Sequence, residues 1–202
     1  MKRIVITDLH KSFDIAQRKV LDGIHMALAP GINCLMGASG IGKTTLARIL
    51  AGLAEPDSGT VIWQDFSLPP RVKQGCIGYV FQEDRLLEWQ TALANLLFVD
   101  TQKNSVRAID LLTQAGLADS IHKKAADLSG GMKRRVTLCR ALMGSHDLLI
   151  LDEPFKGLDD NIKQTAIKMV QVWHSENPEA ILLCITHDED EVRQLGGQRL
   201  HL

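Results

Sequence analysis

Aromatic side chains are scarce in this sequence. Tryptophan, tyrosine and phenylalanine make up 4% of its 202 residues. Surfaces on which the bases of a single strand could stack are therefore few. The 23 lysines and arginines are balanced by 24 aspartates and glutamates, and a net charge of -1 offers no basic face for a phosphate backbone. We therefore expect no nucleic-acid partner.

Long apolar runs are also missing. No run approaches the roughly 18 consecutive apolar residues of a membrane-spanning helix. The opening residues, MKRIVITDLH, contain no apolar stretch of signal-peptide length. We expect a chain that neither spans a membrane nor carries a secretion signal. If it works at a membrane, another chain must hold it there.

The cysteines form no C-x-x-C pair. Cys34, Cys76, Cys139 and Cys184 each stand among apolar residues. This pattern is typical of small buried thiols in a reducing compartment, and we expect neither disulfides nor a metal site from them.

Hydrophobic residues make up 45% of the chain, which is enough for a substantial core. Apolar runs and helical periodicities alternate at both ends, which predicts a parallel α/β core. The first thirty residues predict two strands joined by a turn, and the region from about 91 to 116 has helical spacing. We predict a single domain over 1–202, with a core at about 1–83 and 136–202 and a helical insertion at about 84–135.

A glycine-rich segment follows the short apolar run at 32–36. Gly37–Thr44 reads GASGIGKT and fits the pattern G-x-x-x-x-G-K-[ST]. Glycines let successive N–H groups turn toward an anion, and the helix that follows presents its positive end. Lys43 supplies a cation for the β- and γ-phosphates, and Thr44 a hydroxyl for Mg²⁺. The residues expected around the phosphates are Gly37, Ala38, Ser39, Gly40, Ile41, Gly42, Lys43, Thr44 and Thr45.

A second chemical motif is the run LLILDEP at 148–154. The apolar strand ends in two carboxylates, which places charge at the carboxyl edge of the sheet. Asp152 is suited to hold Mg²⁺ through water, and Glu153 to polarise an attacking water. By itself this motif is also compatible with a plain loop start. Together with the glycine-rich loop it predicts a P-loop nucleoside triphosphatase.

A third motif, LSGGM, occupies residues 128–132. Ser129, Gly130 and Gly131 precede a helix and would form a second helix terminus able to bind an anion. The alternative is that Ser129 only caps the helix.

The order of these motifs resembles that of ABC ATPases over essentially the whole chain: GASGIGKT, Gln82, LSGG, LILDEP, Leu158-Asp159 and Thr186-His187-Asp188. The resemblance implies a P-loop core with an N-terminal antiparallel β-subdomain and an inserted helical subdomain. It also implies ATP and Mg²⁺ as cofactors. In such proteins two copies form a head-to-tail homodimer, and the LSGG motif of one caps the γ-phosphate held by the other.

The same resemblance implies further residue roles. Gln82 corresponds to a residue that touches Mg²⁺ and water, and His187 to a histidine that contacts the γ-phosphate. Asp159 resembles the aspartate of the D-loop, the segment through which the two sites communicate, and is expected among the residues that bind the nucleotide. Phe13 corresponds to the aromatic residue that stacks on adenine, although core packing is an alternative for it. The expected catalytic residues are Glu153, His187 and Gln82, and the expected metal ligands are Thr44, Gln82 and Asp152.

Some positions depart from the family pattern. Lys156 and Gly157 stand where a small polar residue and alanine are common, Arg134 stands in place of glutamine, and Cys139 in place of alanine. None of these changes removes a catalytic group, so we expect an active ATPase. The long carboxyl-terminal extension of many importer subunits is missing, and no regulatory domain is expected.

The run FQEDRLLEW at 81–89 resembles a segment of importer ATPases for nitrate, sulfonates and taurine, although Glu88 stands where proline is usual. Such a segment lies near the site that receives a helix of the membrane subunit. Leu86, Leu87 and Trp89 are candidates for this docking surface. The alternative is a buried apolar loop.

These resemblances lead to one preferred function. We expect an ATPase subunit of a bacterial-type small-solute importer, peripheral on the cytoplasmic face of the cell membrane. Its partners would be transmembrane permease subunits and, indirectly, a periplasmic or surface solute-binding protein. The alternatives are an exporter or lipoprotein-release ATPase, and a soluble ABC ATPase acting on nucleic acid or ribosomes.

Overall fold

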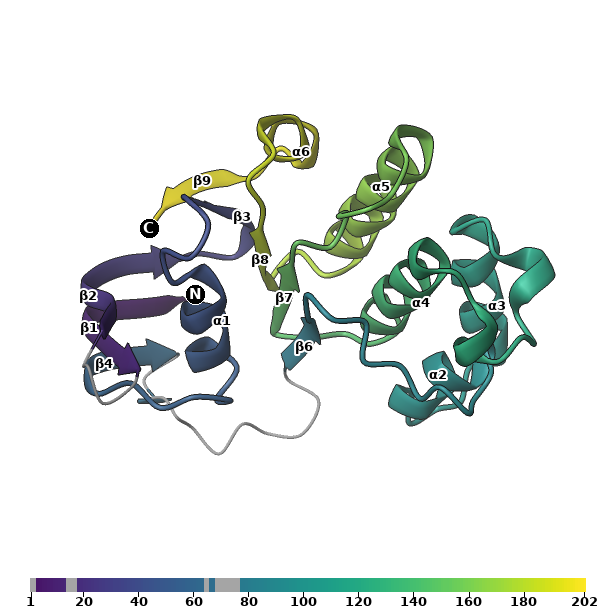
Figure 1. Ribbon diagram of the computed structural model, residues 1–202, viewed down its shortest axis with the longest axis horizontal. Coiled ribbons are helices and arrows are strands. Elements are labelled where there is room, and N and C mark those ends of the chain that lie inside the picture. The colour runs from purple at the N-terminus through teal and green to yellow at the C-terminus, as the bar shows by residue number, and fades with distance from the viewer. Residues whose placement is uncertain (1–2, 14–17, 64–65, 68–76) are drawn as a thin grey trace. The chain divides into compact units, whose positions relative to one another are not determined.

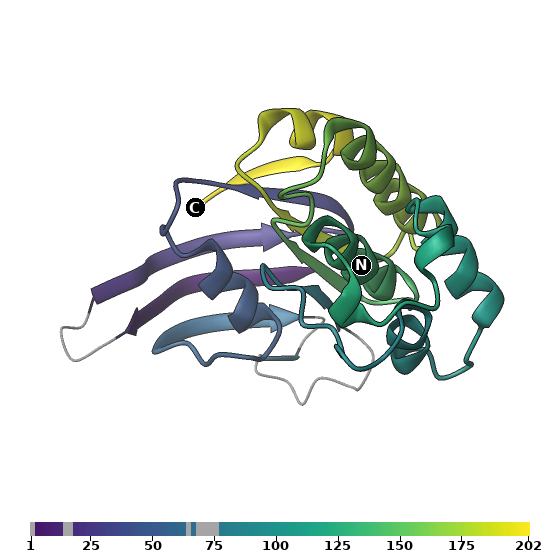
Figure 2. The same ribbon diagram turned by 45° about the vertical axis from the view of Figure 1, so that its right-hand side comes forward.

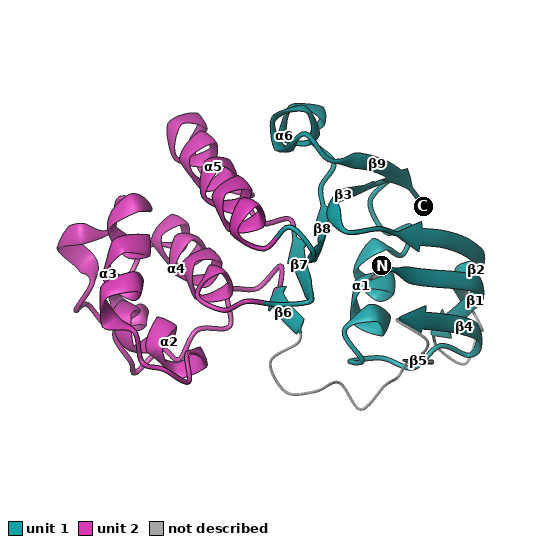
Figure 3. Cartoon of the chain, turned by 180° about the vertical axis from the view of Figure 1, so that it is seen from behind, with its two compact units in different colours: residues 1–79, 146–152, 178–202 teal, residues 80–145, 153–177 magenta. Residues whose placement is uncertain are grey.

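A computed structural model describes residues 3–13, 18–63, 66–67 and 77–202. The chain forms two compact units (Figure 3). The ranges of the first unit are Met1–Tyr79, His146–Asp152 and Pro178–Leu202, and those of the second are Val80–Ser145 and Glu153–Asn177. Cys76, which was expected to be a buried thiol, lies outside the described residues.

An antiparallel sheet forms the amino-terminal part of unit 1. Its strands are β1 (Ile4–Phe13), β2 (Arg18–Leu28), β4 (Ser58–Trp63) and β5 (Phe66–Ser67), in the order β2-β1-β4-β5. Figure 2 shows β2, β1 and β4 side by side. Ile4 and Ile6 are buried, while Thr7 and Asp8 are exposed. An apolar face that alternates with a polar one is typical of an antiparallel sheet with one face against the core. The predicted antiparallel subdomain is confirmed.

A second sheet in unit 1 carries the predicted parallel core. Its strands are β6 (Ile77–Val80), β7 (Leu148–Asp152), β8 (Ile181–Ile185), β3 (Gly31–Met36) and β9 (Gln198–His201), in the order β6-β7-β8-β3-β9. Every residue of β7 and β8 is buried, because these strands are covered on both faces. The strands β7, β8 and β3 are parallel neighbours, so their carboxyl ends lie at one edge of the sheet.

Among its described residues, unit 1 contains the helices α1 (Lys43–Leu50) and α6 (Glu189–Leu195) (Figure 1). Helix α1 buries Leu46, Ile49 and Leu50 in the core, as the spacing predicts. A short helix with such an apolar face is stabilised mainly by tertiary packing. The segment 37–42 joins its amino terminus to the end of β3.

Unit 2 is helical in the part of the chain that the structure describes. Its elements are α2 (Ala92–Val99), α3 (Ser105–Gln114), the 3₁₀ turns η1 (Ala118–Ser120) and η2 (Ala125–Asp127), α4 (Gly130–Leu142) and α5 (Asp160–Glu176). The Trp173 indole on α5 donates to the Gly144 carbonyl oxygen at 2.8 Å, just beyond α4. Among the described helices, none is both long and apolar enough to cross a bilayer.

The observed units differ from the predicted subdomain boundaries. The predicted boundary at 135–136 falls inside the continuous helix α4. Helix α5, which was expected in the core, belongs to the same unit as α2, α3 and α4. The physical reason is that α5 buries an apolar face, including Met169 and Trp173, among helices of that unit.

Candidate functional site

The glycine-rich loop at residues 37–42 joins β3 to α1. Gly37, Gly40 and Gly42 have φ values of 149°, 79° and 116°, in the region that favours glycine. A Cβ atom at Gly42 would lie 2.7 Å from the Val20 carbonyl oxygen, so a side chain does not fit there. Gly42 is also the N-cap of α1 and offers no side-chain acceptor to the first turn. The N–H groups of this turn therefore suit a phosphate.

Lys43 lies against the interior of this loop. The residue is 9% exposed, and its Nζ donates to the carbonyl oxygens of Gly37 at 2.7 Å and Ala38 at 2.8 Å. These bonds hold the ammonium group beside the backbone that would surround an anion. The loop residues Ala38, Ser39, Gly40 and Ile41 are exposed, and Thr44 and Thr45 are partly buried.

Asp152 is the last residue of β7 and is fully buried. It pairs in register with Ile185 of β8, which in turn neighbours β3. Asp152 ends β7, and Thr44 lies in the first turn of α1, which follows β3. Because β7 and β3 run in the same direction in one sheet, both residues lie at its carboxyl edge. Both are hard oxygen donors of the kind that Mg²⁺ prefers, so this donor set fits the expected ion.

His187 follows β8 and is exposed at the same carboxyl edge of the sheet. The backbone around it is held by Thr186, whose hydroxyl donates to the buried Glu191 carboxylate and accepts from the Asp188 N–H at 3.1 Å. Sequence reasoning missed Glu191. Its signal was weak, because an acidic residue in the first turn of a helix is ordinarily a surface residue.

Glu153 has a left-handed backbone, with φ of 49°. Its carboxylate oxygen Oε2 lies 2.9 Å from Nζ of Lys156, and 17% of the glutamate side chain is exposed. Lys156 was noted in the sequence as unusual, but this ion pair was not predicted. An acid and a base three residues apart in a tight turn are the signal that could have found it.

Gln82 is exposed and follows β6 by two residues. The Arg85 guanidinium lies 4.0 Å from the ring centroid of Phe81, the residue before Gln82. The main-chain oxygen of Gln82 accepts from Arg134 at 3.3 Å. Gln82 and Glu153 thus belong to unit 2, whereas the phosphate loop, Asp152 and His187 belong to unit 1.

The motif LSGGM opens α4, as predicted. The Ser129 hydroxyl accepts from the Met132 N–H at 3.3 Å, so capping by this serine is confirmed. Gly130 has open space where a Cβ would lie, and a Cβ at Gly131 would make ordinary contacts with the Gly157 carbonyl oxygen at 3.9 Å and Cδ2 of Leu158 at 4.0 Å. These glycines leave the helix terminus uncovered by side chains of their own, which suits a large anion.

Asp159 is the N-cap of α5, and its Oδ1 accepts from the Ile162 N–H at 3.1 Å. The residue therefore has a local structural role in addition to the one that the resemblance implies. A carboxylate at this position is favourable because it lies at the positive end of the helix.

Two aromatic residues are exposed rather than packed in the core. Phe13, at the end of β1, is 45% exposed, and the Lys11 Nζ lies 5.4 Å from its ring centroid. Trp89 is 69% exposed, while Leu86 and Leu87 are partly buried. The alternative of core packing is wrong for Phe13, and that of a buried loop is wrong for Trp89.

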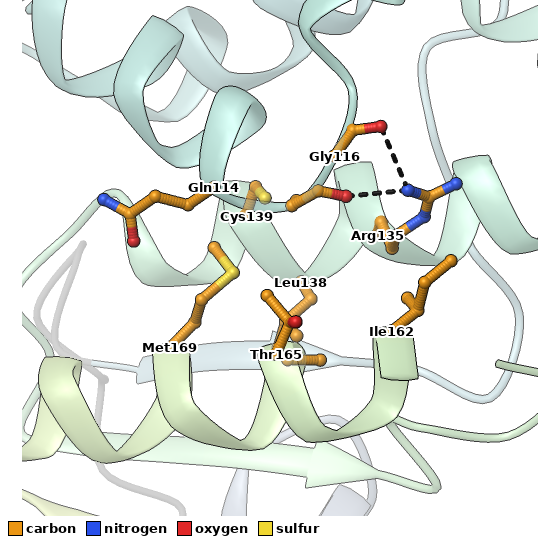
Figure 4. A pocket seen from close by; sticks show the side chains of 10 residues that line it. Gln114, Gly116, Arg135, Leu138, Cys139, Ile162, Thr165 and Met169 are labelled. Carbon is orange, nitrogen blue, oxygen red and sulfur yellow. Dashed lines mark hydrogen bonds between the residues drawn. The ribbon is translucent and has the colours of Figure 1, made fainter. Parts of the chain in front are cut away.

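An apolar cavity of about 230 Å³ lies within unit 2, between the end of α3, the middle of α4 and the part of α5 from Ile162 to Met169 (Figure 4). Arg135 at its edge donates to the carbonyl oxygens of Ala115 and Gly116 at 2.7 and 3.2 Å. Cys139 and Met169 line the cavity, and none of the predicted site residues does. An apolar lining does not suit a triphosphate, so this cavity is not the nucleotide site.

Comparisons with known proteins agree with the fold and the motifs. The family model of the ABC transporter matches residues 21–156. The aliphatic sulfonates import ATP-binding protein SsuB 2 of Pseudomonas syringae pv. syringae (strain B728a) is 40% identical over 188 residues, covering 90% of this chain and 63% of the relative. The chain therefore spans less than two thirds of that relative's length.

A relative of similar length is the putative hemin import ATP-binding protein HrtA of Staphylococcus aureus (strain Newman). It is 35% identical over 200 residues, which cover 92% of this chain and 90% of the relative. Among solved structures, a dimeric ATP-binding cassette in a post-hydrolysis state with ADP and Pi superposes with a TM-score of 0.86. The superposition covers 98% of this chain and 94% of the other at 24% sequence identity, which supports the fold.

Strand β3 of the parallel sheet leads into a glycine-rich phosphate loop, and β7, which β8 separates from β3, ends in Asp152. This arrangement defines a P-loop ATPase. The chain belongs to the ABC transporter family. Its cofactors are those of this family, ATP and Mg²⁺.

Proposed function

We propose that this chain is the ATP-hydrolysing subunit of a bacterial small-solute importer, and that it works as a head-to-tail homodimer beneath permease subunits. The observation that carries the proposal is the presence of two helix amino termini suited to phosphate. One is Gly42–Thr45 at α1, and the other is Ser129–Gly131 at α4. One triphosphate needs both, and a second copy of the chain supplies the second terminus.

The direction of transport is inferred from relatives. The sulfonate and hemin relatives are named as import ATP-binding proteins. The exposed Trp89, in a segment similar to that of importer ATPases, supplies a surface on which a permease helix would dock. This role places the chain on the cytoplasmic face of the membrane, with a solute-binding protein as an indirect partner.

The residue roles combine the chemistry of the groups with what the resemblance to ABC ATPases implies for Gln82, His187 and Phe13. Lys43 and the α1 N–H groups hold the β- and γ-phosphates, and the ring of Phe13 stacks on adenine. Thr44, Asp152 and Gln82 supply oxygen donors for Mg²⁺. Glu153 orients and deprotonates the attacking water, and His187 contacts the γ-phosphate.

The test is Glu153→Gln in the purified chain, assayed with Mg²⁺ and ATP. The amide cannot accept a proton, so we expect hydrolysis to fall by about a hundredfold or more. ATP binding should persist, because the phosphate loop is unchanged. Light scattering should then show an ATP-dependent dimer that does not dissociate.

The matched control is Glu176→Gln, which makes the same change at an exposed position near the end of α5. This variant should hydrolyse ATP at the wild-type rate. Wild-type hydrolysis by Glu153→Gln would remove Glu153 as the base. A variant that binds ATP but stays monomeric would remove the shared site.

A further inference from the structure

The guanidinium of Arg134 connects the two loops of unit 2 that carry Gln82 and Glu153. Arg134 lies on α4 and is only 5% exposed. We propose that Arg134 is a positioning residue for ATP hydrolysis, which sets the backbone of Gln82 and Glu153 relative to each other. This inference rests on the proposed function, because it assigns no contact with nucleotide to Arg134 itself.

The first loop is residues 81–84. Nη1 of Arg134 donates to the Phe81 carbonyl oxygen at 2.6 Å and to the Gln82 carbonyl oxygen at 3.3 Å. The same nitrogen lies 3.3 Å from Oδ1 of Asp84. These bonds hold the peptide groups before and after the Cα atom of Gln82. The direction in which the Gln82 side chain leaves the main chain is therefore constrained.

The second loop begins at Glu153. Nη2 of Arg134 donates to the Glu153 carbonyl oxygen, and Nε donates to the Pro154 carbonyl oxygen at 3.1 Å. Glu153 precedes a proline and has φ of 49°, whereas a residue before proline favours extended backbone. A conformation of this kind persists only where its surroundings hold it. Arg134 supplies two of the hydrogen bonds that do so.

The chemistry of arginine explains why this residue suits the position. A guanidinium has five N–H donors in a fixed plane, and here its three nitrogens reach four main-chain oxygens and one carboxylate. Glutamine, the residue common at this position in the family pattern, has two N–H donors and cannot serve both loops in the same way. The Asp84 carboxylate also offsets the cost of burying the cation.

The consequence is a mechanical connection within unit 2. A shift of the 81–84 loop changes the acceptors on one edge of the guanidinium, and the planar group transmits this change to the carbonyl oxygens of Glu153 and Pro154. The position of the general base therefore depends on the loop that carries Gln82. A misplacement of about 1 Å in such a base can reduce the rate about a hundredfold.

The experiment compares Arg134→Gln with Arg140→Gln in the full chain. Arg140 is a matched control, because it donates from the same helix to the carbonyl oxygens of Asp84 and Arg85, which both lie in the segment 81–85. We expect Arg134→Gln to lower kcat about tenfold or more while the KM for ATP changes less than about twofold. Arg140→Gln should retain kcat within about threefold.

A second measurement does not depend on activity. Hydrogen exchange followed by mass spectrometry should show faster exchange in both 81–85 and 153–156 for Arg134→Gln. For Arg140→Gln the increase should be confined to 81–85. Arg134→Lys keeps the charge but has fewer N–H donors. It replaces Arg134→Gln in both measurements if the glutamine variant does not fold.

Three outcomes would overturn the inference. They are equal kcat values in the two variants, a loss of kcat that follows a loss of Tm in both, and unchanged exchange at 153–156 in Arg134→Gln. An inactive wild-type chain would instead contradict the proposed function, while the exchange result would still decide the connection between the two loops.

Discussion

Burial controls the chemistry of the described thiols. Cys34 and Cys139 lie in apolar surroundings, and burial raises the pKa of Cys34 to about 11 and that of Cys139 to about 12. Burial also raises the pKa of Cys184 well above its usual value. The thiolate is the reactive form, so these three groups are inert packing residues in the folded state. This result confirms the expected role of the cysteines that the structure describes.

Cys139→Ala tests this burial through the pH dependence of stability. The Cys139 pKa rises from 9.0 to about 12 on folding, so the native state retains a proton that the unfolded state loses above pH 9. The stabilising effect is complete below pH 9 and is lost as the pH rises toward 12. We expect urea unfolding to show a smaller alkaline loss of stability in Cys139→Ala than in the wild type.

Met143→Leu is the control for this experiment. Met143 is also buried near the end of α4 but has no titrating proton. The change in the free energy of unfolding caused by Met143→Leu should therefore be the same at every pH. Parallel curves for wild type and Cys139→Ala between pH 9 and 11 would show that the thiol is not desolvated.

At the scale of elements, side-chain caps explain where most helices begin. The residues whose side chains accept from the first turn are Thr91, Asn104, Ser129, Asp159 and Asp188. Each is a residue type whose side-chain oxygen accepts readily from the N–H groups of the first helical turn. Helix α1 differs, since Gly42 gives it no such acceptor. A helix start without its own cap is the arrangement expected where a phosphate occupies that position.

Asp159 allows capping and function to be separated. Asp159→Ala removes the acceptor of the Ile162 N–H and should reduce the free energy of unfolding by about 1 kcal/mol. Asp159→Asn keeps an acceptor, so its urea midpoint should match that of the wild type. We expect both variants to hydrolyse ATP more slowly, because the carboxylate is proposed to link the two sites of the dimer. Full ATPase activity in Asp159→Asn would leave capping as its role.

At the scale of the whole molecule, the proposed chemistry is divided between two units. The chain passes between them four times, and one passage falls at the peptide bond from Asp152 to Glu153. The proposed metal ligand and the proposed base are thus neighbours in sequence but belong to different units. Each unit is compact by itself, and the residues proposed for hydrolysis come from both.

Trp89 concerns the assembly with other chains. Trp89→Glu places a charge on an exposed aromatic side chain and should weaken binding to the permease by about 2 kcal/mol or more. This change corresponds to about a thirtyfold loss of affinity. The measurement is capture of permease subunits from detergent-solubilised membranes by the tagged chain.

Val106→Glu is the matched control, because Val106 is a 78% exposed apolar residue on α3 of the same unit. Its capture of permease and its ATPase activity should equal those of the wild type. Equal capture by Trp89→Glu and wild type would remove Trp89 from the docking surface.

Much of the fold could be predicted because local signals were strong. The apolar runs at 148–151 and 180–186 became β7 and β8, and the spacing after Lys43 became α1. The subdomain boundary could not be predicted, because α4 is one continuous helix and the grouping of α5 depends on packing between distant segments. Periodicity identifies an apolar face but not the element that covers it.

The sequence alone determined the chemistry of this protein. The spacing of Gly37–Thr44, the LSGG motif and the acids at the end of β7 predict a triphosphate site, because backbone N–H groups and a lysine suit phosphate and carboxylates suit Mg²⁺. Only the tertiary structure determined which interactions hold the proposed site residues in place. They are the ion pair between Lys156 and Glu153 and the hydrogen bonds from Arg134 to two loops. Residues 81, 134 and 154 are far apart in sequence, and the guanidinium acquires its acceptors only when α4 is packed beside both loops.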